Sequence, residues 1–221
     1  KINKVFNINN EKKSCIFEYI YFMKNQSYFD NMKVELYRKN VALMMAKRDT
    51  NKYDSNYIVC GVPNTGNEYA IHYAKNMNIE YKEYITKNKK IKRTFILEND
   101  EMRNKHASSK YVLSDELKGK KIILIDDSIV RGITLKNLIK NLRSKEVSEI
   151  HVKSCSPPLN NTCIYGIDIP TRDELIYNNL KDLCKYFDCN SITYVSLEDI
   201  LNIFPNKDSK CTLCLDDKYK W

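Results

Sequence analysis

Two adjacent acidic residues, Asp126 and Asp127, end an apolar run that begins at Lys121. Residues 128–134 follow, with small and hydroxyl side chains, and lead into a helical pattern. Backbone N–H groups in such a segment can hold a phosphate, because the helix N-terminus adds positive potential. Carboxylates repel a phosphate, but they bind sugar hydroxyls or a metal ion, so the whole arrangement suits a phosphorylated sugar. For an isolated Asp-Asp-Ser, an acidic turn that caps the helix is the favoured interpretation.

Cysteines form the second group of residues that could do chemistry. Cys211 and Cys214 make a C-x-x-C pair in a polar stretch, a spacing that lets two thiolates reach one metal centre. Taken alone, the pair is most commonly explained by zinc, or more simply by two exposed thiols. The chain has 8 cysteines in 221 residues, too scattered for a small disulfide scaffold. We therefore expect a reducing compartment and folding without disulfides.

The elements that must position these residues alternate between strand and helix patterns. The clearest unit has a strand at Lys121–Asp126, a turn at 127–134, a helix at Leu135–Arg143 and a second strand at Glu149–Cys155. This order predicts a βαβ unit in a parallel sheet. In parallel sheets ligands gather beside the carboxyl ends of strands, where Asp126 and Asp127 stand.

The remaining elements are predicted from hydrophobic period and residue type. Upstream we expect an extended core segment at Ser14–Met23, a helix at Val34–Lys47, a strand at Asn56–Val62, a helix at Gly66–Met77 and a further strand within Ile79–Ile85. Downstream we expect helices around Glu174–Phe187 and Leu197–Ile203, then a polar stretch at Pro205–Trp221. The charged segment Lys87–Lys110 lacks a steady apolar period and predicts a mobile excursion. The whole indicates one α/β domain with a C-terminal appendage.

Composition narrows the class of protein. No run approaches the roughly 18 apolar residues of a membrane span, and the polar Lys1–Asn10 has no signal-peptide core. A cytoplasmic protein is expected, with a mitochondrial one as the alternative. The net charge of +9 suits an anionic partner, whether nucleic acid, a membrane surface or a phosphorylated substrate. Because the lysines are dispersed, a solvated surface is the favoured explanation of the charge.

Residues 124–134, LIDDSIVRGIT, resemble the phosphoribosyl diphosphate (PRPP) motif of type I phosphoribosyltransferases, in the version found in glutamine PRPP amidotransferases. Four further segments resemble the same family in the same order: CIFEYIYF at 15–22, GVPNTG at 61–66, KNKKIKRTFI at 87–96 and SCSPPLNNTCIYGIDIPTRDELI at 154–176. The resemblance spans nearly the whole chain. It implies a central parallel sheet flanked by helices, with a phosphoribosyltransferase domain at 1–170 and a helical, C-x-x-C-bearing appendage at 171–221.

The resemblance implies a glycosyltransferase that transfers ammonia to PRPP, giving 5-phosphoribosylamine and pyrophosphate, the first step of purine synthesis. By similarity, Asp126 and Asp127 would bind the ribose hydroxyls and Mg²⁺. The segment implied to hold the 5-phosphate is Ser128, Ile129, Val130, Arg131, Gly132, Ile133 and Thr134. The implied pyrophosphate loop includes Pro63, Asn64, Thr65 and Gly66, with Thr65 also contacting Mg²⁺. Lys110 and Arg93 are the expected catalytic residues, on a segment that closes over PRPP.

Some members of the family hold a [4Fe–4S] cluster with cysteines from three segments. These segments match CIFEY, TCIYGID and the terminal C-x-x-C of this chain. The resemblance therefore implies Cys15, Cys163, Cys211 and Cys214 as cluster ligands that clip three distant segments together. The four other cysteines, expected to be packing residues, are Cys60, Cys155, Cys184 and Cys189.

Members of the family begin with a glutaminase domain, and nothing in Lys1–Lys13 resembles one. We expect that domain to be absent from this chain, with ammonia coming from a glutaminase domain or subunit, and the protein to be a homo-oligomer. Motif positions that depart from the family are Asn64, Ile133, Leu135, Lys89, Lys90, Lys92 and Ser108. The alternative is a non-catalytic homologue with a structural cluster, inside a nucleoprotein assembly such as a mitochondrial ribosome.

Overall fold

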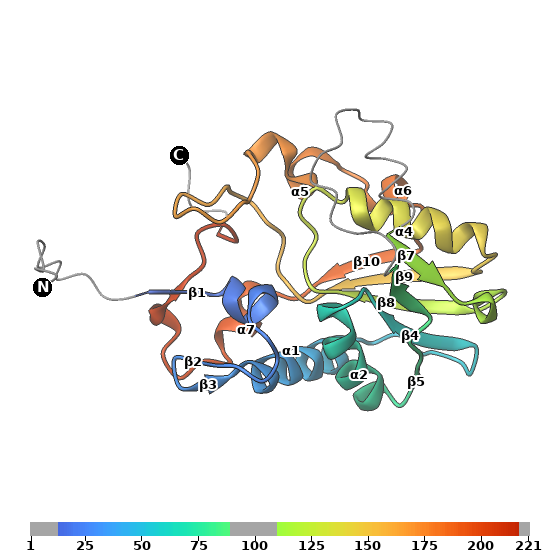
Figure 1. The fold of residues 1–221 in the computed structure, drawn as a ribbon, viewed down its shortest axis with the longest axis horizontal. Coiled ribbons are helices and arrows are strands. Elements are labelled where there is room, and N and C mark those ends of the chain that lie inside the picture. The colour runs from blue at the N-terminus through green and yellow to red at the C-terminus, as the bar shows by residue number, and fades with distance from the viewer. Residues whose placement is uncertain (1–12, 89–109, 217–221) are drawn as a thin grey trace, which may run out of the picture.

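A computed structural model describes residues 13–88 and 110–216 of the chain. Its centre is a parallel five-stranded sheet in the order β10-β9-β8-β4-β5 (Figure 1). The strands are β4 (Tyr57–Gly61), β5 (Glu80–Tyr81), β8 (Lys121–Asp126), β9 (Glu149–Ser154) and β10 (Ser191–Tyr194). In the register of the sheet, Ile123 of β8 lies between Val59 of β4 and His151 of β9. The carboxyl ends of the strands therefore share one edge.

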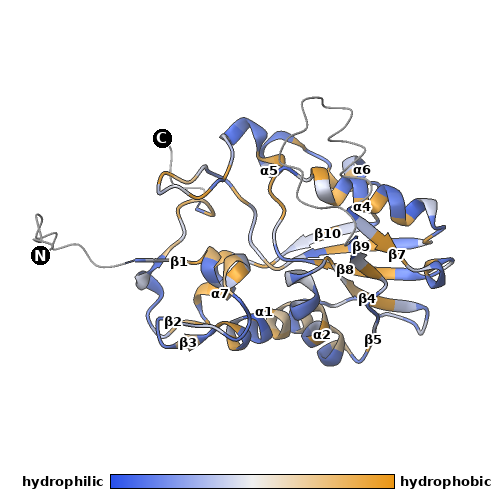
Figure 2. Ribbon diagram, in the orientation of Figure 1, coloured by the Kyte–Doolittle hydropathy of each residue, from blue (hydrophilic) through white to orange (hydrophobic). Residues whose placement is uncertain are grey.

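Helices cover both faces of this sheet, so its central strands are apolar on both sides. Helices α1 (Val34–Arg48) and α2 (Thr65–Met77) lie on one face, and α4 (Ile133–Ser144) lies on the other (Figure 1). Ile123 and Ile125 of β8 belong to the core shared with α1 and α2, while Ile122 and Leu124 belong to the core under α4. Figure 2 shows the hydrophobic residues along β4 and β8 and many hydrophilic residues on α4.

Smaller elements surround the sheet. Three further strand pairs are β1 (Ser14–Cys15) with β11 (Lys210–Cys211), β2 (Tyr28–Phe29) with β3 (Met32–Lys33), and β6 (Ile85–Lys87) with β7 (Tyr111–Leu113). The short helices and helical turns are η1 (Glu18–Phe22), η2 (Asp115–Leu117), η3 (Arg172–Glu174), α5 (Ile176–Asn179), α6 (Leu183–Phe187), α7 (Leu197–Leu201) and η4 (Lys207–Ser209). Within the described ranges, no helix has the length and apolar character needed to cross a bilayer.

The expected central parallel sheet flanked by helices is confirmed, and most of the elements match the sequence-based expectation. The strand at Lys121–Asp126 has the predicted bounds, and α1, α2, β4, α4 and β9 begin and end within two residues of theirs. The segment expected to be one helical region around 174–187 is instead divided into η3, α5 and α6. Residues 191–194, inside the segment expected to be an appendage, form the edge strand β10 of the central sheet.

The prediction of an extended segment at Ser14–Met23 is wrong beyond Cys15. Residues Glu18–Phe22 form the single π-helical turn η1. Arg38 of α1, which is 1% exposed, donates from Nε to the carbonyl of Tyr19 at 3.0 Å and from Nη2 to the carbonyl of Met23 at 2.8 Å. These bonds from a buried arginine satisfy the carbonyls of the turn, and they outweigh the strand propensity of its aromatic residues.

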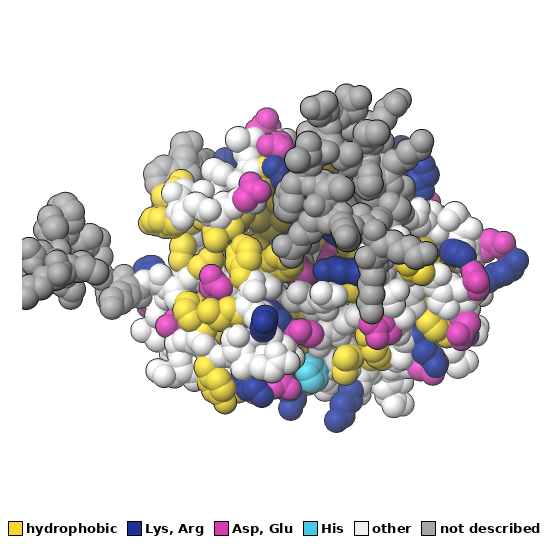
Figure 3. All heavy atoms as spheres, viewed as in Figure 1, with side chains coloured by type: hydrophobic (Ala, Val, Ile, Leu, Met, Phe, Trp, Pro, Cys, Tyr) yellow, Lys and Arg dark blue, Asp and Glu magenta, His cyan; other side chains and the backbone are white. Residues whose placement is uncertain are grey.

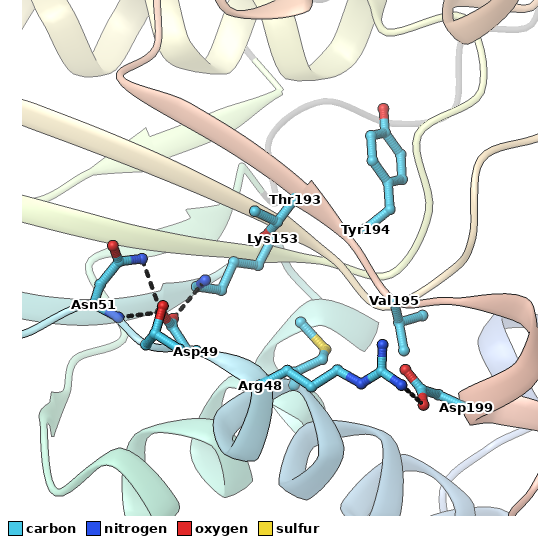
Figure 4. A pocket seen from close by; sticks show the side chains of 10 residues that line it. Arg48, Asp49, Asn51, Lys153, Thr193, Tyr194, Val195 and Asp199 are labelled. Carbon is cyan, nitrogen blue, oxygen red and sulfur yellow. Dashed lines mark hydrogen bonds and ion pairs between the residues drawn. The ribbon is translucent and has the colours of Figure 1, made fainter.

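A buried ion pair fastens the end of α1 to β9 (Figure 4). Lys153 Nζ lies 2.5 Å from Asp49 Oδ2, and the two side chains are 7% and 1% exposed. The hydroxyls of Tyr53 and Tyr73 also donate to Asp49 Oδ2, while the backbone N–H and side-chain amide of Asn51 donate to Oδ1. Because every lone pair of this carboxylate has a donor, the network holds α1 in place against the sheet.

Candidate functional site

A cleft of about 740 Å³ opens at the carboxyl ends of β4 and β8, a size typical of small-molecule sites. Its polar residues come from the strand ends and from β6 and β7: Asn64, Thr65, Lys87, Lys110, Tyr111, Asp126, Asp127, Ser128 and Thr134. A second wall is largely apolar and comes from η1 and the segment after β9: Phe17, Tyr21, Phe22, Leu159, Ile167, Asp168 and Ile169. We call the polar set the charged floor of the cleft and the second set its aromatic wall.

Asp126 is buried and Asp127 is half-buried, and both lie on this floor. Asp126 is 9% exposed and accepts a hydrogen bond from the backbone N–H of Asp127 at 3.0 Å, and the hydroxyl of Ser128 donates to Asp127 Oδ1 at 2.9 Å. Burial raises the pKa of Asp126 well above its usual value, and the charge of Asp127 raises it further. Burial also raises the pKa of Asp127. A buried pair of this kind favours a divalent cation or hydroxyl donors as its ligand.

The segment after the acidic pair wraps a second hollow of about 390 Å³, lined by Asp126 and by residues 128–135. Both hollows share Asp126, Ser128, Val130 and Thr134, so they are continuous. Helix α4 begins at Ile133, and its first residues, Ile133, Thr134 and Leu135, line this hollow. A helix N-terminus at that position suits an anion. The side chain of Arg131 instead lies 2.8 Å from Glu174, and the side chain of Ile129 is buried in the core.

Gly132 ends the loop in the left-handed region, with φ of 73°. A Cβ placed there would lie 2.5 Å from Ile176 Cδ1 and 2.8 Å from Phe187 Cζ, so α5 and α6 close off this side of the loop.

Gly132→Ala is expected to destabilise the protein by about 2–5 kcal/mol, the sum of left-handed backbone strain and overpacking. Urea unfolding followed by circular dichroism measures the loss. Gly119→Ala is the matched control, because Gly119 has φ of 72° and nothing within 4 Å of its added Cβ. Equal losses in the two variants would show that packing against α5 and α6 does not constrain the loop.

The loop at 62–66 approaches the acidic pair through the backbone. The N–H of Val62 donates to the carbonyl of Ile125 at 2.8 Å, and a Cβ on Gly66 would lie 2.6 Å from that same oxygen. The Pro63–Asn64 peptide bond is cis, and Thr65 begins α2. Pro63, Asn64 and Thr65 all line the cleft, so the two loops predicted to bind opposite ends of one ligand flank the acidic pair.

Lys110 lines the cleft next to β7, and its carbonyl accepts a hydrogen bond from the N–H of Asn88 at 3.0 Å. Burial and the charge of Lys87 lower the pKa of Lys110, whereas Asp126 and Asp127 raise it. Its ammonium group is therefore within electrostatic reach of the acidic pair. Arg93, the other expected catalytic residue, lies outside the described residues.

The cysteines expected to be ligands come together from three parts of the chain. Cys15 of β1 is paired with Cys211 of β11, and the carbonyl of Cys214 accepts hydrogen bonds from the N–H groups of Asn160 and Asn161. Burial raises the pKa of Cys214 to about 12, with further contributions from Cys15, Cys163 and Cys211. All four thiols are free. The segments that bear them are thus held side by side.

In the part of the chain that the structure describes, no three His, Cys, Asp or Glu side chains are grouped tightly enough for a single metal ion. Zinc would need such a group, since its thiolate bonds are only about 2.3 Å long. In an iron–sulfur cluster each thiolate binds a different iron, so the sulfurs stand further apart. Four free thiols on adjoining segments are the kind of donor set that an iron–sulfur cluster uses. Of the four cysteines expected to be packing residues, Cys60, Cys155 and Cys189 are buried, and Cys184 is half-buried against the core under α4.

Sequence reasoning missed two features of the cleft. One is the aromatic wall, whose signal was the run CIFEYIYF, interpreted only through its cysteine and as an extended segment. The other is a pair of charged residues, Lys87 of β6 and Asp168 of an irregular turn, which also line the cleft. Neither follows a strand of the central sheet, so no sequence pattern marked them as site residues.

Comparison with known proteins agrees with this geometry. Residues 31–156, more than half of the chain, match the model of the phosphoribosyl transferase domain. Curated relatives named amidophosphoribosyltransferase include those of Rattus norvegicus, 38% identical over 85% of this chain and 36% of the relative, and Bacillus subtilis, 34% identical over 95% and 44%. The solved glutamine PRPP amidotransferase from B. subtilis, complexed with ADP and GMP, is 31% identical with a TM-score of 0.83, over 96% of this chain and 48% of that one. The chain spans less than half the length of these relatives.

Proposed function

This chain belongs to the phosphoribosyl transferase domain family, and we propose that it transfers ammonia to PRPP, giving 5-phosphoribosylamine and pyrophosphate in purine synthesis. The names of its relatives support the proposal. The observation that carries it is the cleft, where a buried acidic pair lies between two loops suited to phosphate groups.

Each part of the cleft has a task in this reaction. Asp126 and Asp127 accept hydrogen bonds from the ribose hydroxyls, and together with Thr65 they would hold Mg²⁺. When bound, Mg²⁺ neutralises the negative charge that grows on pyrophosphate. The N–H groups of residues 128–134 hold the 5-phosphate, and the loop at 62–66 holds the pyrophosphate. Lys110 and Lys87 place positive charge beside the leaving group.

We also propose that a glutaminase domain or subunit delivers ammonia at the aromatic wall. Tyr21 and Phe22 are 50% and 46% exposed, their ring centroids are 5.3 Å apart, and Phe17 lies behind Phe22 at 6.4 Å. Figure 3 shows hydrophobic side chains gathered on this face, where η1 and the segment after β9 lie. Exposed aromatic side chains of this kind mark interaction surfaces, and an apolar partner there would keep water away from the reacting carbon.

For the cysteines we propose a [4Fe–4S] cluster on Cys15, Cys163, Cys211 and Cys214. Protein purified without oxygen is expected to be brown and to contain about four irons per chain. Cys163→Ser should lower the iron content and the thermal midpoint, because the cluster would join three segments. Cys60→Ser, in the core of β4, is the control and should keep the iron. A colourless preparation that contains zinc would contradict the proposal.

Calorimetry with PRPP and Mg²⁺, followed by a pyrophosphate assay with added ammonium chloride, tests the main proposal. We expect PRPP to bind only with Mg²⁺ and pyrophosphate release to rise with ammonia. Absence of PRPP binding would contradict the proposal and favour the non-catalytic alternative, in which the fold and cluster serve within a nucleoprotein assembly.

A further inference from the structure

Asp168 lines the cleft but belongs to none of the segments expected to bind PRPP. It is the central residue of a three-residue turn, in which the N–H of Ile169 donates to the carbonyl of Ile167 at 2.7 Å. The hydroxyl of Thr162 donates to the carbonyl of Ile169 at 2.9 Å, and the side chain of Ile169 is buried. The turn is therefore anchored on both sides, while Asp168 itself is exposed to the cleft.

The surroundings of Asp168 set it apart from the acidic pair. Its wall also contains Phe17, Phe22 and Leu159, and Asp168 is the only carboxylate that this wall contributes among the described residues. Within the described ranges it makes neither an ion pair nor a hydrogen bond, so its carboxylate is available to a ligand in the cleft. An unpaired carboxylate beside aromatic faces suits a small nitrogen compound that carries or develops positive charge.

The proposed reaction produces such a species. The nitrogen of ammonia forms a bond to the anomeric carbon, and the bond from that carbon to oxygen breaks, with its electron pair leaving on pyrophosphate. The new C–N group is then an ammonium and must lose one proton to become the amine. Asp126 and Asp127 are occupied by the ribose and Mg²⁺ in the proposed complex, and Lys87 and Lys110 are cations.

We propose that Asp168 is a further catalytic residue, which orients the attacking ammonia by accepting a hydrogen bond from it and then takes the proton. The proposal rests on the proposed function, because it assigns the nucleophile side of that reaction. As the bond forms, the carboxylate also stabilises the positive charge on nitrogen, and positioned proton acceptors typically contribute about 10²–10⁴-fold.

The test uses the full chain purified without oxygen, with Asp168→Asn and Asp168→Ala. At saturating PRPP and Mg²⁺, we expect Asp168→Asn to lower kcat/KM for ammonia by roughly 100-fold, with the Kd for PRPP within twofold of the wild type. Formate should restore part of the activity of Asp168→Ala, because it can occupy the vacated space and accept the proton. Formate should not help Asp168→Asn, whose amide still fills that space. Asp173→Asn, an exposed acid on η3, is the matched control.

Wild-type kcat/KM in Asp168→Asn would overturn the inference and leave the proposed function standing. Loss of PRPP binding in parallel with activity would also overturn it, since Asp168 would then act on PRPP or on the fold. Absence of turnover in the wild type would instead refute the proposed function, and the inference with it.

Discussion

Asp127→Asn is expected to lower pyrophosphate release from PRPP by at least about 100-fold, since hydrogen bonds to a charged group contribute about 1.5–3 kcal/mol each. The substitution keeps the shape of the side chain and removes the charge that holds Mg²⁺ and the ribose hydroxyls. Because the charge of Asp127 adds to burial in raising the pKa of Asp126, removing that charge relieves repulsion in the folded protein. The free energy of unfolding should therefore stay unchanged or rise while activity falls.

Steady-state pyrophosphate release and urea unfolding measure these two quantities on the same preparation. Asp115→Asn is the control, since the side chain of Asp115 is 94% exposed and pairs with Lys145 at the surface. It should leave both quantities near the wild-type values. An Asp127→Asn variant with wild-type turnover would remove the acidic pair from the mechanism.

The second large effect concerns stability. Asp49→Ala is expected to cost about 3–5 kcal/mol, because it leaves the ammonium of Lys153 buried with no counter-charge. It also takes an acceptor from the hydroxyls of Tyr53 and Tyr73. Urea unfolding measures the loss. Glu146→Ala is the control, because its ion pair with Lys118 has side chains 66% and 72% exposed and should contribute less than about 1 kcal/mol.

Acid provides a second measurement of the same network. Burial alone would raise the pKa of Asp49, but hydrogen bonds from Lys153, Tyr73 and Tyr53 lower it from 3.8 to about 2. A carboxyl with a lowered pKa stabilises the fold above its unfolded pKa, and this contribution is lost as the pH falls from about 4 to about 2. Asp49→Ala should flatten the pH dependence of unfolding in that window. If the pH dependence of unfolding were the same in Asp49→Ala as in the wild type, the ionised carboxylate of Asp49 would not contribute to stability in that window.

The βαβ unit around the acidic pair could be predicted from sequence because its signals are local. The apolar run ending at Asp126 marks a strand buried on both faces, and the buried Leu135, Leu138, Ile139 and Leu142 recur at helical spacing. A strand followed by a loop and a helix then places Asp126 and Asp127 at a ligand-binding edge. In the structure, both carboxylates line the cleft at the carboxyl ends of β4 and β8.

The features that sequence did not predict depend on partners distant in the chain. The helical turn η1 is held by Arg38, which lies in a helix whose charged residues are mostly exposed. Strand β10 is only four residues long, and its extended conformation depends on its pairing with β9. Asp168 reaches the cleft through an irregular turn, for which no periodic pattern exists. In each case a tertiary contact, and not local propensity, determines the conformation.

The pairing of β1 with β11 has a consequence for how the protein is made. Ser14 and Ser209 are 195 positions apart in sequence, yet the side chain of one lies against the backbone of the other. A chain synthesised from its amino terminus exposes Cys15 long before the strand carrying Cys211 exists. The sheet and its flanking helices can form first, and the first strand becomes ordered only when the last one is released. For the proposed [4Fe–4S] cluster, insertion of iron is then among the latest steps in maturation.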